Sequence, residues 1–279
     1  YKERRHLLIL KMNQRQKKAK NWFTELRDKF CSEFESIDGN KFKRKKWSHK
    51  GKGGGEMSIM KGDVFEKVGV NISTVSGNFS KEFRSQIKGT QKSSKYWASG
   101  ISLVAHMHSP KVPAFHFNTR YLVTGDSWFG GGADMTPCIS NIKNKNLFHK
   151  KMKEACDSSD KTYYPEFKKN CDEYFYLPHR KEARGIGGIF FDHLNTGDWE
   201  NDFKFIQDVG LKTFEVISQI VVQNKDFKWT QKQKEIQLLK RGRYVEFNLI
   251  WDRGTLFGLR TGGSTEAILM SMPPTAKWN

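Results

Sequence analysis

The chain has 279 residues, of which 37% are hydrophobic, so it can bury a substantial core and is not expected to be disordered. Its 49 Lys and Arg exceed its 30 Asp and Glu, and the net charge of +19 favours anionic ligands. The four cysteines show no CxxC spacing, and no apolar run approaches the roughly 20 residues of a membrane helix. Neither a zinc ribbon, a disulfide scaffold nor a membrane span is indicated, and we expect reduced thiols and a cytoplasmic location.

An amphipathic helix is predicted over residues 21–37, where large apolar residues recur every fourth position: Trp22, Leu26, Phe30 and Phe34. Residues 1–20 are expected to form a flexible or helical extension. The basic run KFKRKKWSHKGK, residues 41–52, is interpreted as a solvated loop that continues to Gly55. Strands are expected in residues 55–77, which combine short apolar runs with β-branched residues.

Two alternating segments, SGISLVAHMH (99–108) and AFHFNTRYLV (114–123), are predicted to form an antiparallel hairpin across the prolines of SPKVP. Pairing centred on Lys111 would place His106 opposite His116 and Ser102 opposite Arg120. One face of the hairpin would then carry a group of polar side chains: Ser102, His106, His116, Asn118 and Arg120.

The stretch WFGGGADMTP, residues 128–137, lacks the lysine and the Ser/Thr of a nucleotide phosphate loop. Three consecutive glycines permit close backbone approach and positive φ. We therefore interpret them as a tight turn against a ligand or another strand.

The C-terminal half is predicted to contain helices between residues 140 and 184, a strand at GIGGIFFDHLN (185–195), and helices over 203–222 and 229–240. RYVEFNLIWDRG (243–254) alternates and is predicted to be a long strand, paired through the turn RTGGS with TEAILMSMPP (265–274). On that strand Glu246, Asn248 and Asp252 would share a face, and an aspartate partly desolvated by its apolar neighbours would need hydrogen-bond donors. Hairpins with helices grouped between them predict a single-domain α+β fold with a large, mostly antiparallel sheet flanked by helices.

The residues by themselves leave the chemistry open. No GxSxG, HExxH or cysteine-nucleophile signature is present, which gives hydrolase chemistry little support. The histidines could bind a divalent metal, carry protons or fill hydrogen-bonded positions. A basic nucleic-acid-binding module and a metal-dependent oxygenase acting on another substrate are the alternatives, although scattered lysines are also produced by biased genomic composition.

Four blocks of sequence are nevertheless specific in combination: HFNTRY, WFGGGADMTP, CDEYFYLPHRKEARGIGGIFFDHLN and GRYVEFNLIWDRGTLFGLRTGGSTEAILMSMPP. Together they resemble the oxygen-dependent coproporphyrinogen III oxidases, in the family's order, over about residues 22–274. The resemblance implies that two propionates of coproporphyrinogen III become vinyl groups in haem biosynthesis, giving protoporphyrinogen IX, CO2 and H2O2. It also implies molecular oxygen as co-substrate, no organic cofactor, and a homodimer formed through about residues 244–279.

The resemblance further implies roles for individual residues. Catalytic importance falls on His116, as proton donor, and on Asp252 and Arg253, while substrate contacts fall on Ser102, Asn118, Thr119, Arg120, Gly262, Gly263 and Ser264. Bacterial members are described with a divalent ion such as manganese on four histidines, which match His106, His116, His149 and His179, whereas eukaryotic members are described as needing none. His116 cannot be both a ligand and a free proton donor. Many members have an arginine at the position of Ser264, and Arg260 is the nearby candidate to compensate.

Overall fold

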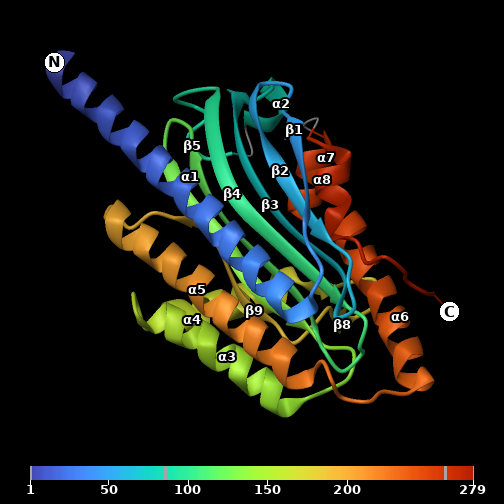
Figure 1. Cartoon of the computed structure of the whole chain (residues 1–279). Coiled ribbons are helices and arrows are strands. Elements are labelled where there is room, and N and C mark those ends of the chain that lie inside the picture. The colour runs from blue at the N-terminus through green and yellow to red at the C-terminus, as the bar shows by residue number, and fades with distance from the viewer. Residues whose placement is uncertain (1, 85–86, 261–262, 279) are drawn as a thin grey trace.

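The computed structural model describes residues 2–84, 87–260 and 263–278. Its centre is a seven-stranded antiparallel sheet in the order β1-β2-β3-β4-β5-β6-β9 (Figure 1). The strands are β1 (Lys43–Ser48), β2 (Lys52–Met60), β3 (Phe65–Asn78), β4 (Lys95–Met107), β5 (Ala114–Val123), β6 (Ser127–Thr136) and β9 (Gly188–Leu194). A separate short hairpin is formed by β7 (Tyr176–Leu177) and β8 (Glu182–Ala183). The strands follow each other as a meander, which confirms the expected α+β class.

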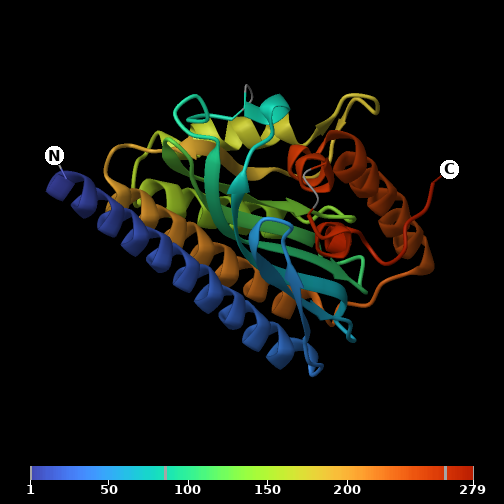
Figure 2. The same ribbon diagram turned by 90° about the horizontal axis from the view of Figure 1, so that it is seen from above.

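Helices cover the sheet on both sides (Figure 2). One side is packed against α1 (Lys2–Asp38), α3 (Ile142–Asp157), α4 (Tyr163–Tyr174) and α5 (Trp199–Asn224). The other side carries the C-terminal segment, which comprises α6 (Gln231–Glu246), α7 (Arg253–Arg260) and α8 (Thr265–Ile268). A short helix, α2 (Lys81–Arg84), lies in the β3–β4 connection. Within the described part of the chain, no helix is long and apolar enough to cross a bilayer.

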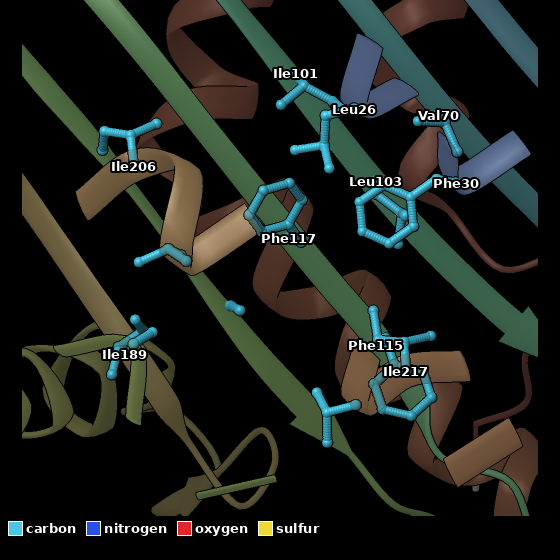
Figure 3. Close-up of a cluster of buried hydrophobic side chains, with 14 of the residues drawn as sticks. Leu26, Phe30, Val70, Ile101, Leu103, Phe115, Phe117, Ile189, Ile206 and Ile217 are labelled. Carbon is cyan, nitrogen blue, oxygen red and sulfur yellow. The ribbon is translucent and has the colours of Figure 1, made fainter. Parts of the chain in front are cut away.

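The main core lies between the sheet and the first group of helices (Figure 3). Alternation along β5 buries Phe115 and Phe117 on this side and leaves the even-numbered residues partly exposed on the other. The Phe117 ring contacts that of Phe30 on α1 at a centroid distance of 5.8 Å. Leu26 from α1 and Ile206 and Ile217 from α5 belong to the same core. The predicted amphipathic helix is therefore confirmed, and it continues upstream to Lys2.

The predicted β4–β5 hairpin is present, but its register differs by two residues. Ser102 pairs with Asn118, Val104 with His116, and Gly100 with Arg120. The turn is closed by a bond from Val112 N to Ser109 O and is centred earlier than Lys111. Because the side-chain period is two, this shift leaves the predicted residues on the predicted face.

Three local predictions are wrong. The basic run 41–52 is not a loop but contributes to β1 and β2, and its exposed lysines protect a sheet edge from pairing with another chain. The triple glycine is not a turn, because it lies within β6 between β5 and β9. Residues 243–254 and 265–274 form no hairpin: the first continues α6 into a π-helix (Phe247–Trp251), and the second forms α8 and a 3-10 helix (Leu269–Ser271).

Candidate active site

The sheet face opposite the main core presents Asn118 and Arg120 between small residues. Asn118 lies between Ser102 on β4 and Gly132 on β6, and Arg120 lies between Gly100 and Gly130. A Cβ added at Gly130 would come within 2.9 Å of Arg120 Nη2. Because the glycines of GGG have no side chains, they leave room on this face of β6 for the polar side chains of the neighbouring strands.

A chain of hydrogen bonds crosses this face from β5 to β6. Arg120 Nη1 donates to Asn118 Oδ1 at 3.2 Å, and Asn118 Nδ2 lies 3.1 Å from His116 Nε2. His116 Nδ1 lies 2.7 Å from Asp134 Oδ1. Since Arg120 fixes which end of the Asn118 amide accepts, Nε2 of His116 accepts from Asn118 and the ring proton lies on Nδ1, toward Asp134. His116 is thus a neutral imidazole with its proton held by a carboxylate.

Asp134 and Arg184 form a buried ion pair behind His116. Arg184 Nη2 donates to Asp134 Oδ2 at 2.6 Å, and both side chains are almost completely buried. Burial would raise the pKa of Asp134, but Arg184 and His116 outweigh it and hold that pKa below its usual value. The guanidinium of Arg184 is also enclosed by the rings of Phe175 and Tyr244, at 4.0 and 4.5 Å.

Neither Asp134 nor Arg184 was singled out from the sequence. Both lie inside the quoted blocks, in GGGAD and KEARG. The available signal was an aspartate in the otherwise small and apolar run of β6, because a carboxylate buried there needs a cationic partner.

Asp252 has the donors that the sequence reasoning required. Tyr174 Oη donates to its Oδ1 at 2.7 Å, while Thr255 N and Oγ1 donate to its Oδ2 at 2.9 and 2.6 Å. Burial raises the pKa of Asp252, but these bonds prevail and lower it. His116 in its protonated form lowers this pKa further, so the two groups are within electrostatic reach. The predicted neighbours on a shared strand face are wrong: Glu246 binds His179 and Arg180 instead.

The structure places the other predicted residues in different surroundings. Arg253 is exposed with its Cζ 4.9 Å from the ring centre of Tyr174, and Ser102 lies across from Asn118 on the site face. Thr119, in contrast, points into the core and is fully buried, so only its backbone lies toward the site. Ser264 is the N-cap of α8 and Gly263 N donates to Gly258 O, whereas Gly262 lies outside the described residues, as does the side chain of Arg260.

Comparison with known proteins identifies the family of this chain. A family model described as coproporphyrinogen III oxidase matches residues 18–279. The chain belongs to the coproporphyrinogen III oxidase family. It is 58% identical to the oxygen-dependent coproporphyrinogen-III oxidase of Rickettsia akari (strain Hartford) over 269 residues, which are 93% of this chain and 96% of that protein. The corresponding enzyme of Rickettsia bellii (strain OSU 85-389) is 57% identical over 268 residues, covering 92% and 96%. The resemblance read from the four blocks is therefore confirmed.

In this coproporphyrinogen III oxidase family member, the four predicted metal ligands do not come together. The ring nitrogens of His149, on α3, are bonded to Ile186 O and Tyr164 Oη, on the side of the sheet that holds the main core. Those of His179 are bonded to Glu246 and Trp251. His106 is buried, with Nε2 bonded to Ser271 O at 2.9 Å, and burial lowers its pKa to about 3. Among the described residues no group of three or more His, Cys, Asp or Glu could hold a metal ion, so the four histidines do not fit one shell.

Proposed function

We propose that this chain catalyses the oxygen-dependent conversion of coproporphyrinogen III to protoporphyrinogen IX in haem biosynthesis. For each of two propionates, R–CH2–CH2–COOH and O2 give R–CH=CH2, CO2 and H2O2. The substrate supplies both electrons and oxygen accepts them, so the balance requires no organic cofactor. The observation that carries the proposal is the chain Arg120–Asn118–His116–Asp134 on a glycine-flanked sheet face, within electrostatic reach of the ionised Asp252.

Arginines are suited to hold the propionates. A guanidinium meets a carboxylate through two parallel N–H bonds, which fixes the orientation as well as the charge. Arg120 and the exposed Arg253 are the arginines that the predicted set places here. The net charge of +19 also raises the rate at which a tetracarboxylate meets the protein.

Asp252 is suited to face the pyrrole N–H groups. Its bonds from Tyr174 and Thr255 hold it as an anion, and its Oδ1 carries one such bond, which leaves a lone pair for another donor. An anion in this place stabilises positive charge that develops on the electron-rich ring when it reacts with oxygen.

His116 is suited to move a proton. Its Nε2 lone pair accepts from Asn118 Nδ2 and takes up a proton when that hydrogen bond opens, while its Nδ1–H is fixed by Asp134, which stabilises the imidazolium that then forms. Arg184 keeps Asp134 ionised for this task. No step is assigned to a metal ion, because the histidines predicted to bind one are engaged elsewhere.

The homodimer and the compartment belong to the same proposal. Apolar side chains that are large and exposed gather in the C-terminal segment: Leu249, Ile250, Trp251, Phe257 and Leu259. Such a patch is typical of a protein interface and supports a dimer contact within residues 244–278. All four cysteines are free, which fits the reducing cytoplasm.

The test is incubation of the purified protein with coproporphyrinogen III in air without added cofactor, followed by fluorescence detection of protoporphyrin after oxidation. Parallel reactions contain manganese or a chelator. We expect product in all three and one H2O2 for each vinyl group. Asp252→Ala should abolish turnover, whereas Asp226→Ala, which removes an exposed aspartate paired with Lys225, should not. Absence of product in every reaction would refute the proposal.

A further inference from the structure

Asp192 on β9 lies on the same sheet face as the proposed site and contacts Arg120. Arg120 Nη2 and Asp192 Oδ1 are 3.0 Å apart, and each side chain is about one-third exposed. The two residues belong to β5 and β9, which are not neighbours because β6 lies between them. The ion pair therefore spans a strand, and something must leave space for it.

Gly130 on β6 leaves that space. It pairs directly with Arg120, and a Cβ built on it would lie 2.7 Å from Asp192 Oδ1 and 2.9 Å from Arg120 Nη2. Any residue other than glycine would displace the ends of both side chains. The first glycine of the GGG run thus has a specific use, which is to let this pair form across β6.

The backbone of β9 is also bent at this point. The β6–β9 register shifts between Phe129 and Gly131, and His193 has a φ of +56°, which is unusual for a residue with a side chain. In this bend His193 N donates to Asp192 Oδ1 at 3.0 Å. Irregular backbone of this kind is retained where it aims a functional side chain. Here it aims Asp192 toward Arg120.

We infer that Asp192 is a positioning residue that holds Arg120 ready to bind a substrate carboxylate. A guanidinium has five N–H donors, of which Arg120 uses one on Nη1 for Asn118, while Nη2 forms the ion pair with Asp192 and commits at most one more. At least three donors remain, enough for a bidentate carboxylate contact. Anchored at two points, Arg120 loses little side-chain freedom when the carboxylate binds, and affinity rises accordingly. The inference rests on the proposed function, with a propionate as the carboxylate.

The experiment measures binding and turnover separately. Coproporphyrin III, the air-stable oxidised tetracarboxylate, is titrated by fluorescence against wild type, Asp192→Ala, Asp192→Asn and Gly130→Ala, and KM and kcat are measured with coproporphyrinogen III. Asp126→Ala is the matched control, because Asp126 is also about one-third exposed and pairs with Lys92 at 2.9 Å in the β5–β6 connection.

We expect Asp192→Ala to raise Kd and KM at least fivefold while kcat stays within twofold. Asp192→Asn keeps an accepting oxygen and should stay within twofold of wild type. Gly130→Ala should reproduce the effect of Asp192→Ala through a different residue, and adding it to Asp192→Ala should have little further effect. The control should be unchanged.

Unchanged Kd and KM in Asp192→Ala would overturn the inference, and so would an Asp192→Asn variant as weak as Asp192→Ala. If Asp192→Ala does not fold, the test rests on Gly130→Ala. Wild-type affinity of Gly130→Ala for coproporphyrin III would show that binding does not need the Arg120–Asp192 pair. A wild-type protein that binds coproporphyrin III but shows no turnover refutes the proposed function instead. The two failures are thereby distinguished.

Discussion

The buried ion pair behind His116 provides a sharp test of how this site is held. Replacing Arg184 by Met keeps much of the side-chain volume among Phe175, Tyr244 and Phe247 but leaves the carboxylate of Asp134 buried without its cation. Removing one partner of a buried pair costs about 3–5 kcal/mol, because the remaining charge is uncompensated. We expect Arg184→Met to destabilise the protein by that amount at neutral pH.

The chain offers a matched control four residues away. Arg180 Nη2 lies 2.6 Å from Glu246 Oε1, the same distance as in the Arg184–Asp134 pair, but the Arg180 side chain is 38% exposed, compared with 2% for Arg184. Pairs exposed to solvent contribute about 0–1 kcal/mol. Arg180→Met should therefore cost less than Arg184→Met, because Arg180 is partly exposed and Glu246 keeps its contacts with His179 and Arg243.

Urea unfolding followed by tryptophan fluorescence measures both variants. Asp134 has a folded pKa below its unfolded value of about 3.9, so its ionisation contributes stability above that pH and loses it as the pH falls through the folded pKa. Without Arg184 the folded pKa rises. The destabilisation of Arg184→Met should therefore shrink on acidification, as Asp134 becomes protonated.

A double-mutant cycle completes the test. Asp134→Asn together with Arg184→Met removes the unpaired charge, so the double variant should be less destabilised than the sum of the two single variants. Equal destabilisation by Arg184→Met and Arg180→Met, with additive effects in the cycle, would refute the reasoning that a buried pair holds this part of the site.

Three further outcomes are expected. Thr255→Val removes the hydroxyl bond to Asp252, so the pKa of Asp252 should rise and the acidic limb of the kcat–pH profile should move to higher pH. Gly69→Val places a side chain where a Cβ would lie 1.7 Å from Met270 Sδ, so it should displace the 3-10 helix from β3, lower stability by about 1–3 kcal/mol and increase proteolysis of the C-terminal segment. Ile250→Glu should convert the proposed dimer to monomer in light scattering, with an unchanged circular dichroism spectrum.

Local patterns were sufficient where one periodicity dominated. Apolar residues recur at every fourth position in α1 and at every second position in β5, and each pattern fits one amphipathic arrangement. The burial of Phe30 and of Phe117 follows from these two patterns. The face shared by Ser102, His116, Asn118 and Arg120 was predicted despite the wrong register, because a shift by two residues conserves the face.

The C-terminal segment shows where such patterns fail. RYVEFNLIW alternates, yet the residues that it buries are Tyr244, Phe247 and Asn248. These are positions i, i+3 and i+4, which lie on one face of a helix. Both periods fit so short a run, and packing against the sheet decides between them. The same lack of context made the triple glycine look like a turn, although its neighbours β5 and β9 require it to be a strand.

The sequence by itself determined the family, the α+β class, and the strand face that carries His116, Asn118 and Arg120, because each depends on residue identity or on short-range period. Only the tertiary structure decided the partners of these residues. Asp134, which contacts His116, and Arg184, which pairs with Asp134, lie 18 and 68 residues after His116 in the chain. Asp192 lies 72 residues after its partner Arg120. A buried charge reveals that it needs a counter-charge, but which residue supplies it depends on how strands and loops far apart in the chain come together.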